Sequence, residues 1–132
     1  MSLGESATPL GKVRGLGSAH HGGGHWLEER FTSVALVLLS FWLIFSLVML
    51  PNLERATLVE WLGSPWGAIP MALLIVAAFK HGLDGLKVAV DDYVHEEGNR
   101  IGIHFILNMA AIAGASIALF ALAKIAFGAP AA

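Results

Sequence analysis

Three long apolar runs, separated by short polar stretches, dominate the pattern of this chain. The first run, residues 31–50, contains twenty residues and no charge. A helix of that length crosses the roughly 30 Å hydrocarbon core of a bilayer. The second run extends over about 65–90 and the third over about 101–127. The pattern predicts an all-α membrane protein with three transmembrane helices at these positions.

The composition supports a membrane location. Of the 132 residues 56% are hydrophobic and only 14% are charged, whereas a soluble domain has about 25% charged residues. The mean hydropathy is +0.70. A net charge of −2 offers no basic surface for nucleic acid. Because cysteine is absent, the chain itself cannot supply a disulfide, an iron–sulfur ligand or a catalytic thiol.

The second span carries ionisable residues to membrane depth. Its uncharged run, 66–79, has only fourteen residues, so a helix that crosses the bilayer must take Lys80 and His81 into the exit half. Placed on a helix, four charged residues of alternating sign share one face within about 60°. They are Lys80, Asp84, Lys87 and Asp91. We expect a structural ladder in which each member can pair with the next.

His81 belongs to a second stripe of the same helix, about 90° from the charged ladder. Gly85 and Asp92 share this stripe, and Ala77 and Ala78 lie one turn before His81. These small neighbours would admit a flat, bulky group against the backbone. From the residues alone, His81 is either a ligand or proton relay or a histidine that is only hydrogen-bonded. Asp92 and Tyr93 would by default be an interfacial cap and an aromatic anchor.

The segments outside the three spans are polar or rich in glycine. Residues 1–25, rich in glycine and containing Pro9, predict a flexible N-terminal arm without the apolar core of a secretory signal. Three histidines in the arm could bind a metal, but the neighbouring glycines do not fix their positions. They are His20, His21 and His25. The alternative is that the arm lies against a partner at the membrane surface. Residues 51–65 are expected to form a loop and 91–100 a polar turn that breaks the helix.

Polar side chains inside the other two spans have expected structural roles. Four hydroxyls in the first span can bond back to the helix or across to a neighbour; they belong to Thr32, Ser33, Ser40 and Ser46. The third span has a surface of small residues between Ala111 and Ala118, which favours close helix packing. Its His104 is interpreted as a hydrogen-bonded packing residue.

Lys and Arg residues predict the orientation in the membrane. Five lie on the side of the N-terminus and the second loop: Lys12, Arg14, Arg30, Lys87 and Arg100. Two, Arg55 and Lys124, lie on the other side. We therefore expect a cytoplasmic N-terminus.

The combination of His81, Gly85 and the pair Asp92-Tyr93, with residues 25–30 before the first span and Arg100 after the second, resembles one family. It is similar to the smaller membrane-anchor subunit of succinate:quinone oxidoreductase, which is succinate dehydrogenase or respiratory complex II. The resemblance covers nearly the whole chain in length, topology and loop sizes.

The resemblance implies specific roles. His81 would be one axial ligand of the iron of haem b, and the larger, cytochrome b-type anchor subunit would supply the other. Tyr93 would hydrogen-bond ubiquinone, with Asp92 as its acidic neighbour, and Arg30 would lie near the quinone or the haem propionates. FAD and the iron–sulfur clusters would belong to a flavoprotein and an iron–sulfur subunit. The four subunits would work in a bacterial inner membrane, in electron transport and the tricarboxylic acid cycle, with this chain and its partner anchor forming a helical bundle.

Two other functions stay open. The nearest is the anchor of a quinol:fumarate reductase, which has the same architecture run in reverse. A small proton-coupled transport or assembly protein could instead use Lys80, His81 and Asp84 as a relay. Three spans without an internal repeat argue against a transporter that works alone. This chain is not expected to be an enzyme by itself.

Overall fold

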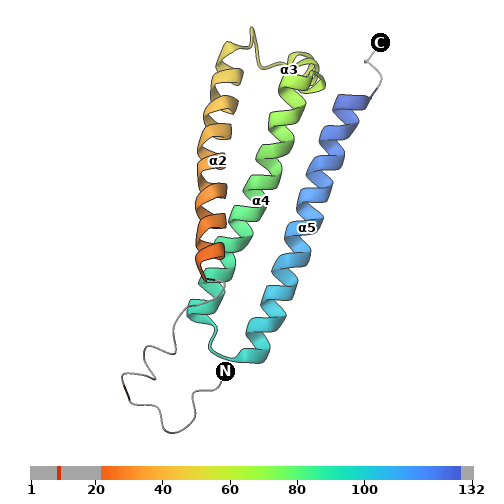
Figure 1. The fold of residues 1–132 in the computed structure, drawn as a ribbon. Coiled ribbons are helices and arrows are strands. Elements are labelled where there is room, and N and C mark those ends of the chain that lie inside the picture. Colours follow the sequence, from red (N-terminus) through yellow and green to blue (C-terminus); the bar gives the residue numbers. More distant parts are fainter. Residues whose placement is uncertain (1–8, 10–21, 129–132) are drawn as a thin grey trace.

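The computed structural model describes Pro9 and residues 22–128. Four helices follow one another in 22–128: α2 (Gly22–Met49), α3 (Arg55–Gly63), α4 (Pro65–Tyr93) and α5 (Glu97–Phe127). The long helices α2, α4 and α5 lie side by side, and the short α3 lies at one end of them (Figure 1). α4 is the central helix, because its backbone lies close to those of the other three, while the described backbones of α2 and α5 do not approach each other.

The three long helices are each long and apolar enough to cross a membrane. The shortest of these segments has 24 residues, which at 1.5 Å per residue gives about 36 Å. Large apolar side chains on all three helices point outward, and within the described part of the chain the only buried hydrophobic residue is Leu122. Outward apolar side chains suit contact with lipid or with other membrane helices. The predicted all-α membrane protein with three transmembrane helices is confirmed.

Capping side chains set the beginnings of α4 and α5. The Ser64 hydroxyl accepts a hydrogen bond from the backbone N–H of Gly67 at 3.2 Å, and Pro65 occupies the first helical position, where its missing N–H is not needed. The Glu96 carboxylate accepts from the backbone N–H of Asn99 at 3.0 Å. Each cap satisfies one of the N–H groups that a helix start leaves without an internal partner.

The prediction of a loop at 51–65 is wrong for most of this segment, because residues 55–63 form α3. Its sequence, RATLVEWLG, is short, but the helix packs against both α4 and α5. Trp61 of α3 also stacks on Trp42 of α2, with ring centroids 5.6 Å apart. Tertiary packing of this kind stabilises helices that are too short to persist alone.

Two other expected boundaries shift. α2 begins at Gly22, so residues 22–25 are helical rather than part of an irregular arm. The rest of the arm, apart from Pro9, lies outside the described residues, and so do His20 and His21. The polar turn is confined to 94–96, because the Glu96 cap allows 97–100, including Gly98, to form the first turn of α5.

The contact between α4 and α5, here called the α4/α5 seam, depends on a small residue. Gly114 of α5 faces the ring of Phe79 of α4, and a Cβ added at Gly114 would lie 2.6 Å from the Phe79 Cε1 atom. Only glycine permits this approach without a shift of the ring. At Gly114, the small-residue surface expected on the third span therefore packs closely within this chain.

Candidate functional site

A cavity of about 310 Å³ lies between α2 and α4. Its lining combines a carboxylate, a guanidinium, a hydroxyl and an imidazole with two small or apolar positions, from Glu29, Arg30, Ser33, His81, Gly85 and Val88. It is therefore a mixed polar site within two helices that can span a membrane. We call it the α2/α4 cavity.

His81 lies on this cavity and is joined to α2 by a hydrogen bond. Its Nδ1 atom is 3.1 Å from the hydroxyl oxygen of Thr32. The same hydroxyl donates to the backbone oxygen of Glu29 at 3.0 Å, and the Ser33 hydroxyl donates to that oxygen at 2.7 Å. The expectation that hydroxyls of the first span bond back to the helix or across to a neighbour is confirmed for Thr32, which does both, and for Ser33, which bonds back. Ser40 and Ser46 make no such bond to a described residue.

Arg30 enters the same cavity from α2. Its guanidinium carbon lies 4.7 Å from the centroid of the Trp26 ring, a distance at which a cation is attracted to an aromatic face. That contact holds the long side chain near the helix start. The structure thus brings together two of the four predicted site residues, His81 and Arg30.

Tyr93 and Asp92 lie elsewhere. Tyr93 is the last residue of α4, about 18 Å along the axis from His81 at 1.5 Å per residue. The residue is 83% exposed, and Asp92 is exposed as well. Neither lines the α2/α4 cavity. This chain by itself leaves both groups open at the end of α4.

The charged ladder forms only its first step. Lys80 pairs with Asp84 one turn along α4, and its ammonium is also 3.5 Å from a carboxylate oxygen of Glu28 on α2. Asp84 is 4% exposed and is the one buried charged residue in the described part of the chain. Lys87 makes no ion pair with any described residue. The prediction that Lys87 would pair with Asp84 and with Asp91 is therefore wrong.

Asp91, the last member of the expected ladder, turns to α5 instead. Its carboxylate lies 3.8 Å from Nε of Arg100 and 3.3 Å from Nε2 of His104. The partly buried position of His104 fits the expected packing role. Its Nε2 atom is buried without a well-formed hydrogen bond to a described residue, so the expected hydrogen bond of the ring is not seen.

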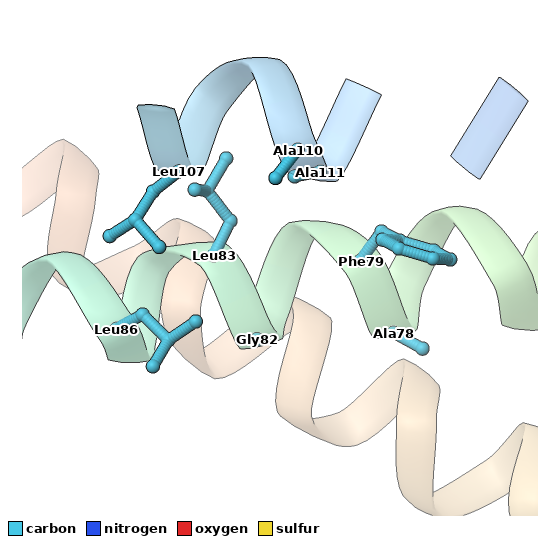
Figure 2. A pocket seen from close by; sticks show the side chains of 8 residues that line it. All are labelled: Ala78, Phe79, Gly82, Leu83, Leu86, Leu107, Ala110 and Ala111. Carbon is cyan, nitrogen blue, oxygen red and sulfur yellow. The ribbon is translucent and has the colours of Figure 1, made fainter. Parts of the chain in front are cut away.

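A second cavity, of about 270 Å³, lies between α4 and α5 (Figure 2). All its lining residues are apolar: Ala78, Phe79, Gly82, Leu83, Leu86, Leu107, Ala110 and Ala111. It offers no side-chain ligand or proton donor. Among the side chains that the structure describes, moreover, no group of three or more His, Asp or Glu is gathered to hold a metal ion.

Sequence reasoning missed the contribution of α2 to the site. It singled out Arg30 but gave no role at His81 to Thr32, Ser33 or Glu29. The signal was present, because Thr32 and Ser33 are the first hydroxyls after the charged start of the span. Which of them would face His81 depends on how α2 crosses α4. The sequence of either helix alone does not determine this crossing.

The fold and the cavity define a three-span membrane protein with a histidine-bearing site between its first two spans. Residues 5–120 match the family described as succinate dehydrogenase/fumarate reductase transmembrane subunit. The chain belongs to this family.

Similar curated proteins carry the name succinate dehydrogenase hydrophobic membrane anchor subunit. The one from Paracoccus denitrificans is 31% identical over 124 residues, which cover 92% of this chain and 94% of that protein. The one from Rickettsia bellii is 31% identical over 83 residues, covering 63% of this chain and 66% of that protein. The Rickettsia conorii protein is 31% identical over 84 residues, covering 63% and 67%.

Proposed function

We propose that this chain is the membrane-anchor subunit of a succinate dehydrogenase, that it binds haem b together with a larger anchor subunit, and that it helps form the site of ubiquinone reduction. The observation that carries the proposal is the α2/α4 cavity, where the His81 imidazole and the Arg30 guanidinium share one open site. Family membership and the names of the relatives support it.

The residues around the cavity fit a haem. His81 offers an imidazole, a good ligand of haem iron, and Arg30 offers the planar donor group that pairs with carboxylates such as propionates. A Cβ added at Gly85 would meet no heavy atom within 4 Å, so open space lies over the backbone one turn from His81. When bound, the haem would supply a one-electron carrier, and a second ligand from the partner anchor would leave no open position for oxygen chemistry.

His81→Ala tests the haem proposal. We expect the purified complex to lose the b-haem band from its reduced-minus-oxidised spectrum, because the side chain that would ligate iron is gone. The three spans remain, so co-purification with flavoprotein and iron–sulfur subunits shows whether the complex has assembled. An unchanged spectrum in an assembled variant would refute the role of His81.

Tyr93 and Asp92 would act on the quinone. Reduction of a quinone adds two electrons and two protons, and a Tyr hydroxyl can donate a hydrogen bond to the oxygen on which negative charge builds. The open position of Tyr93 at the end of α4 supports this role, because a site completed by other subunits needs groups that its own chain does not cover. Asp92 would order the site and its protons.

Tyr93→Phe tests the quinone contact. The change keeps the ring and deletes one donor, so quinone-linked succinate oxidation should fall on the order of 10²-fold, by analogy with a single oxyanion donor. Oxidation linked to an artificial acceptor in the same membranes should not change. If the ratio of the two rates equals the wild-type ratio, the hydroxyl does not contact the quinone.

The proposed partners are a flavoprotein with FAD, an iron–sulfur subunit and a cytochrome b-type anchor, in a bacterial inner membrane with the N-terminus in the cytoplasm. The count of Lys and Arg residues supports this orientation. A cysteine at Asn99 should resist an impermeant thiol reagent in intact cells, and one at Asn52 should react. The opposite result would mean that the chain is inverted.

The family description also includes fumarate reductase, so the same site could pass electrons from quinol to fumarate. The ratio of succinate oxidation to fumarate reduction by the purified complex decides between the two directions.

A further inference from the structure

The Thr32 hydroxyl has two polar neighbours and only one hydrogen. Its oxygen lies 3.0 Å from the backbone oxygen of Glu29 and 3.1 Å from Nδ1 of His81. A carbonyl oxygen can only accept, whereas an imidazole nitrogen donates or accepts according to its tautomer. If the hydroxyl gives its hydrogen to Glu29, its oxygen accepts from an Nδ1–H group of His81.

The position of His81 decides which nitrogen would meet a metal. Nδ1 is engaged by Thr32, and the ring has no other hydrogen bond to a described residue. Nε2 is therefore the nitrogen left for a ligand in the α2/α4 cavity. A neutral imidazole that coordinates through Nε2 carries its proton on Nδ1, which is the tautomer that the Thr32 oxygen can accept from.

We infer that Thr32 is a positioning residue for His81: it holds Nδ1 protonated and leaves Nε2 free for the haem iron. This inference rests on the proposed function, since it needs His81 to be the ligand. The hydrogen bond also limits rotation of the ring. By drawing on the Nδ1 proton it makes the imidazole a stronger donor, which stabilises ferric over ferrous iron and lowers the haem potential.

A simpler role competes with this one. Thr hydroxyls inside helices commonly bond back to the carbonyl three or four residues earlier, and Ser33 does this at the same carbonyl. Thr32 would then only pack against His81. A packing role depends on the shape of the side chain, whereas a positioning role depends on its oxygen.

The test compares Thr32→Val, which keeps the shape and deletes the oxygen, with Thr32→Ser, which keeps the oxygen and deletes a methyl group. Both are measured in the purified complex, by redox titration of the b haem and by the largest g value of its low-spin ferric EPR signal. Ser46→Ala, a hydroxyl deletion farther along α2, is the control. We expect the Val variant to raise the midpoint potential and move the g value, and the Ser and control variants to match the wild type.

Other outcomes are equally decisive. If the Val variant matches the wild type, or if Val and Ser change both readouts alike, Thr32 does not act through its oxygen. If Val loses the haem and Ser keeps it, the inference holds; if both lose it, the inference fails. A wild-type b-haem spectrum in assembled His81→Ala would instead refute the proposed role of His81 as a haem ligand, a result that the Thr32 variants alone do not give.

Discussion

The two sides of α4 are joined to their neighbours in different ways. Toward α5, apart from the polar contacts of Asp91 near the end of α4, contact is made by shape: Phe79 lies on Gly114, and the cavity there is wholly apolar (Figure 2). Toward α2, contact is made by polar groups, through Thr32 with His81 and through Glu28 with Lys80. Polar contacts fix two helices at a few points and need not fill the space between them. The α2/α4 cavity lies beside those points.

The side of α4 that faces α5 therefore stabilises the fold, whereas the side that faces α2 carries groups suited to chemistry. Ionisable groups at membrane depth are costly and tend to mark function. The α2/α4 side has several of them near His81, whereas the cavity in the α4/α5 seam has none. Variants on each side should therefore fail differently.

The largest loss of stability is expected from Lys80→Met. It would leave Asp84, 4% exposed, as a buried charge without its partner, which typically costs about 3–5 kcal/mol. The thermal midpoint of the purified complex measures the effect. The double variant Lys80→Met with Asp84→Leu is the control and should recover most of the loss, because no charge is then left alone. A single variant as stable as the wild type would mean that Asp84 has another partner or water.

A smaller loss is expected in the α4/α5 seam from Gly114→Ala. The new Cβ would lie 2.6 Å from Cε1 of Phe79, and overpacking of this kind costs about 1–3 kcal/mol. Haem content should stay normal in complexes that assemble. Gly102→Ala is the matched control, because an added Cβ there meets no heavy atom within 4 Å. Equal thermal midpoints for the two variants would contradict the close packing of this seam.

Much of the fold could be predicted because the length and polarity of each span are evident from its own residues. The short uncharged run before Lys80 was enough to place His81 within a span. α3 could not be predicted in this way, since its stability depends on contacts with α4 and α5 and with Trp42 of α2. What the sequence of α3 does not contain is how this helix lies on its neighbours.

The same reason explains what was missed in the site. Helical spacing put Lys80, Asp84, Lys87 and Asp91 on one face, but it gave no account of partners on other helices. Glu28 of α2 joins Lys80, and Arg100 of α5 draws Asp91 away from Lys87. Likewise, His81 and Gly85 of one stripe both line the α2/α4 cavity, but the spacing within α4 does not reveal that Thr32 of α2 contacts His81.

The smallest loss of stability is expected from Asp91→Asn, which removes a polar contact on the α5 side of α4. Its side chain is 53% exposed and that of Arg100 39%, and ion pairs this open to solvent contribute about 0–1 kcal/mol. The thermal midpoint should fall slightly at low salt, and the difference from the wild type should shrink at high salt as the pair is screened. Arg100→Gln, which removes the other half of the pair, should behave alike. If Asp91→Asn lost as much stability as Lys80→Met, independently of salt, another subunit would have to bury this carboxylate. The contrast between the two sides of α4 would then hold for the isolated chain but not for the complex.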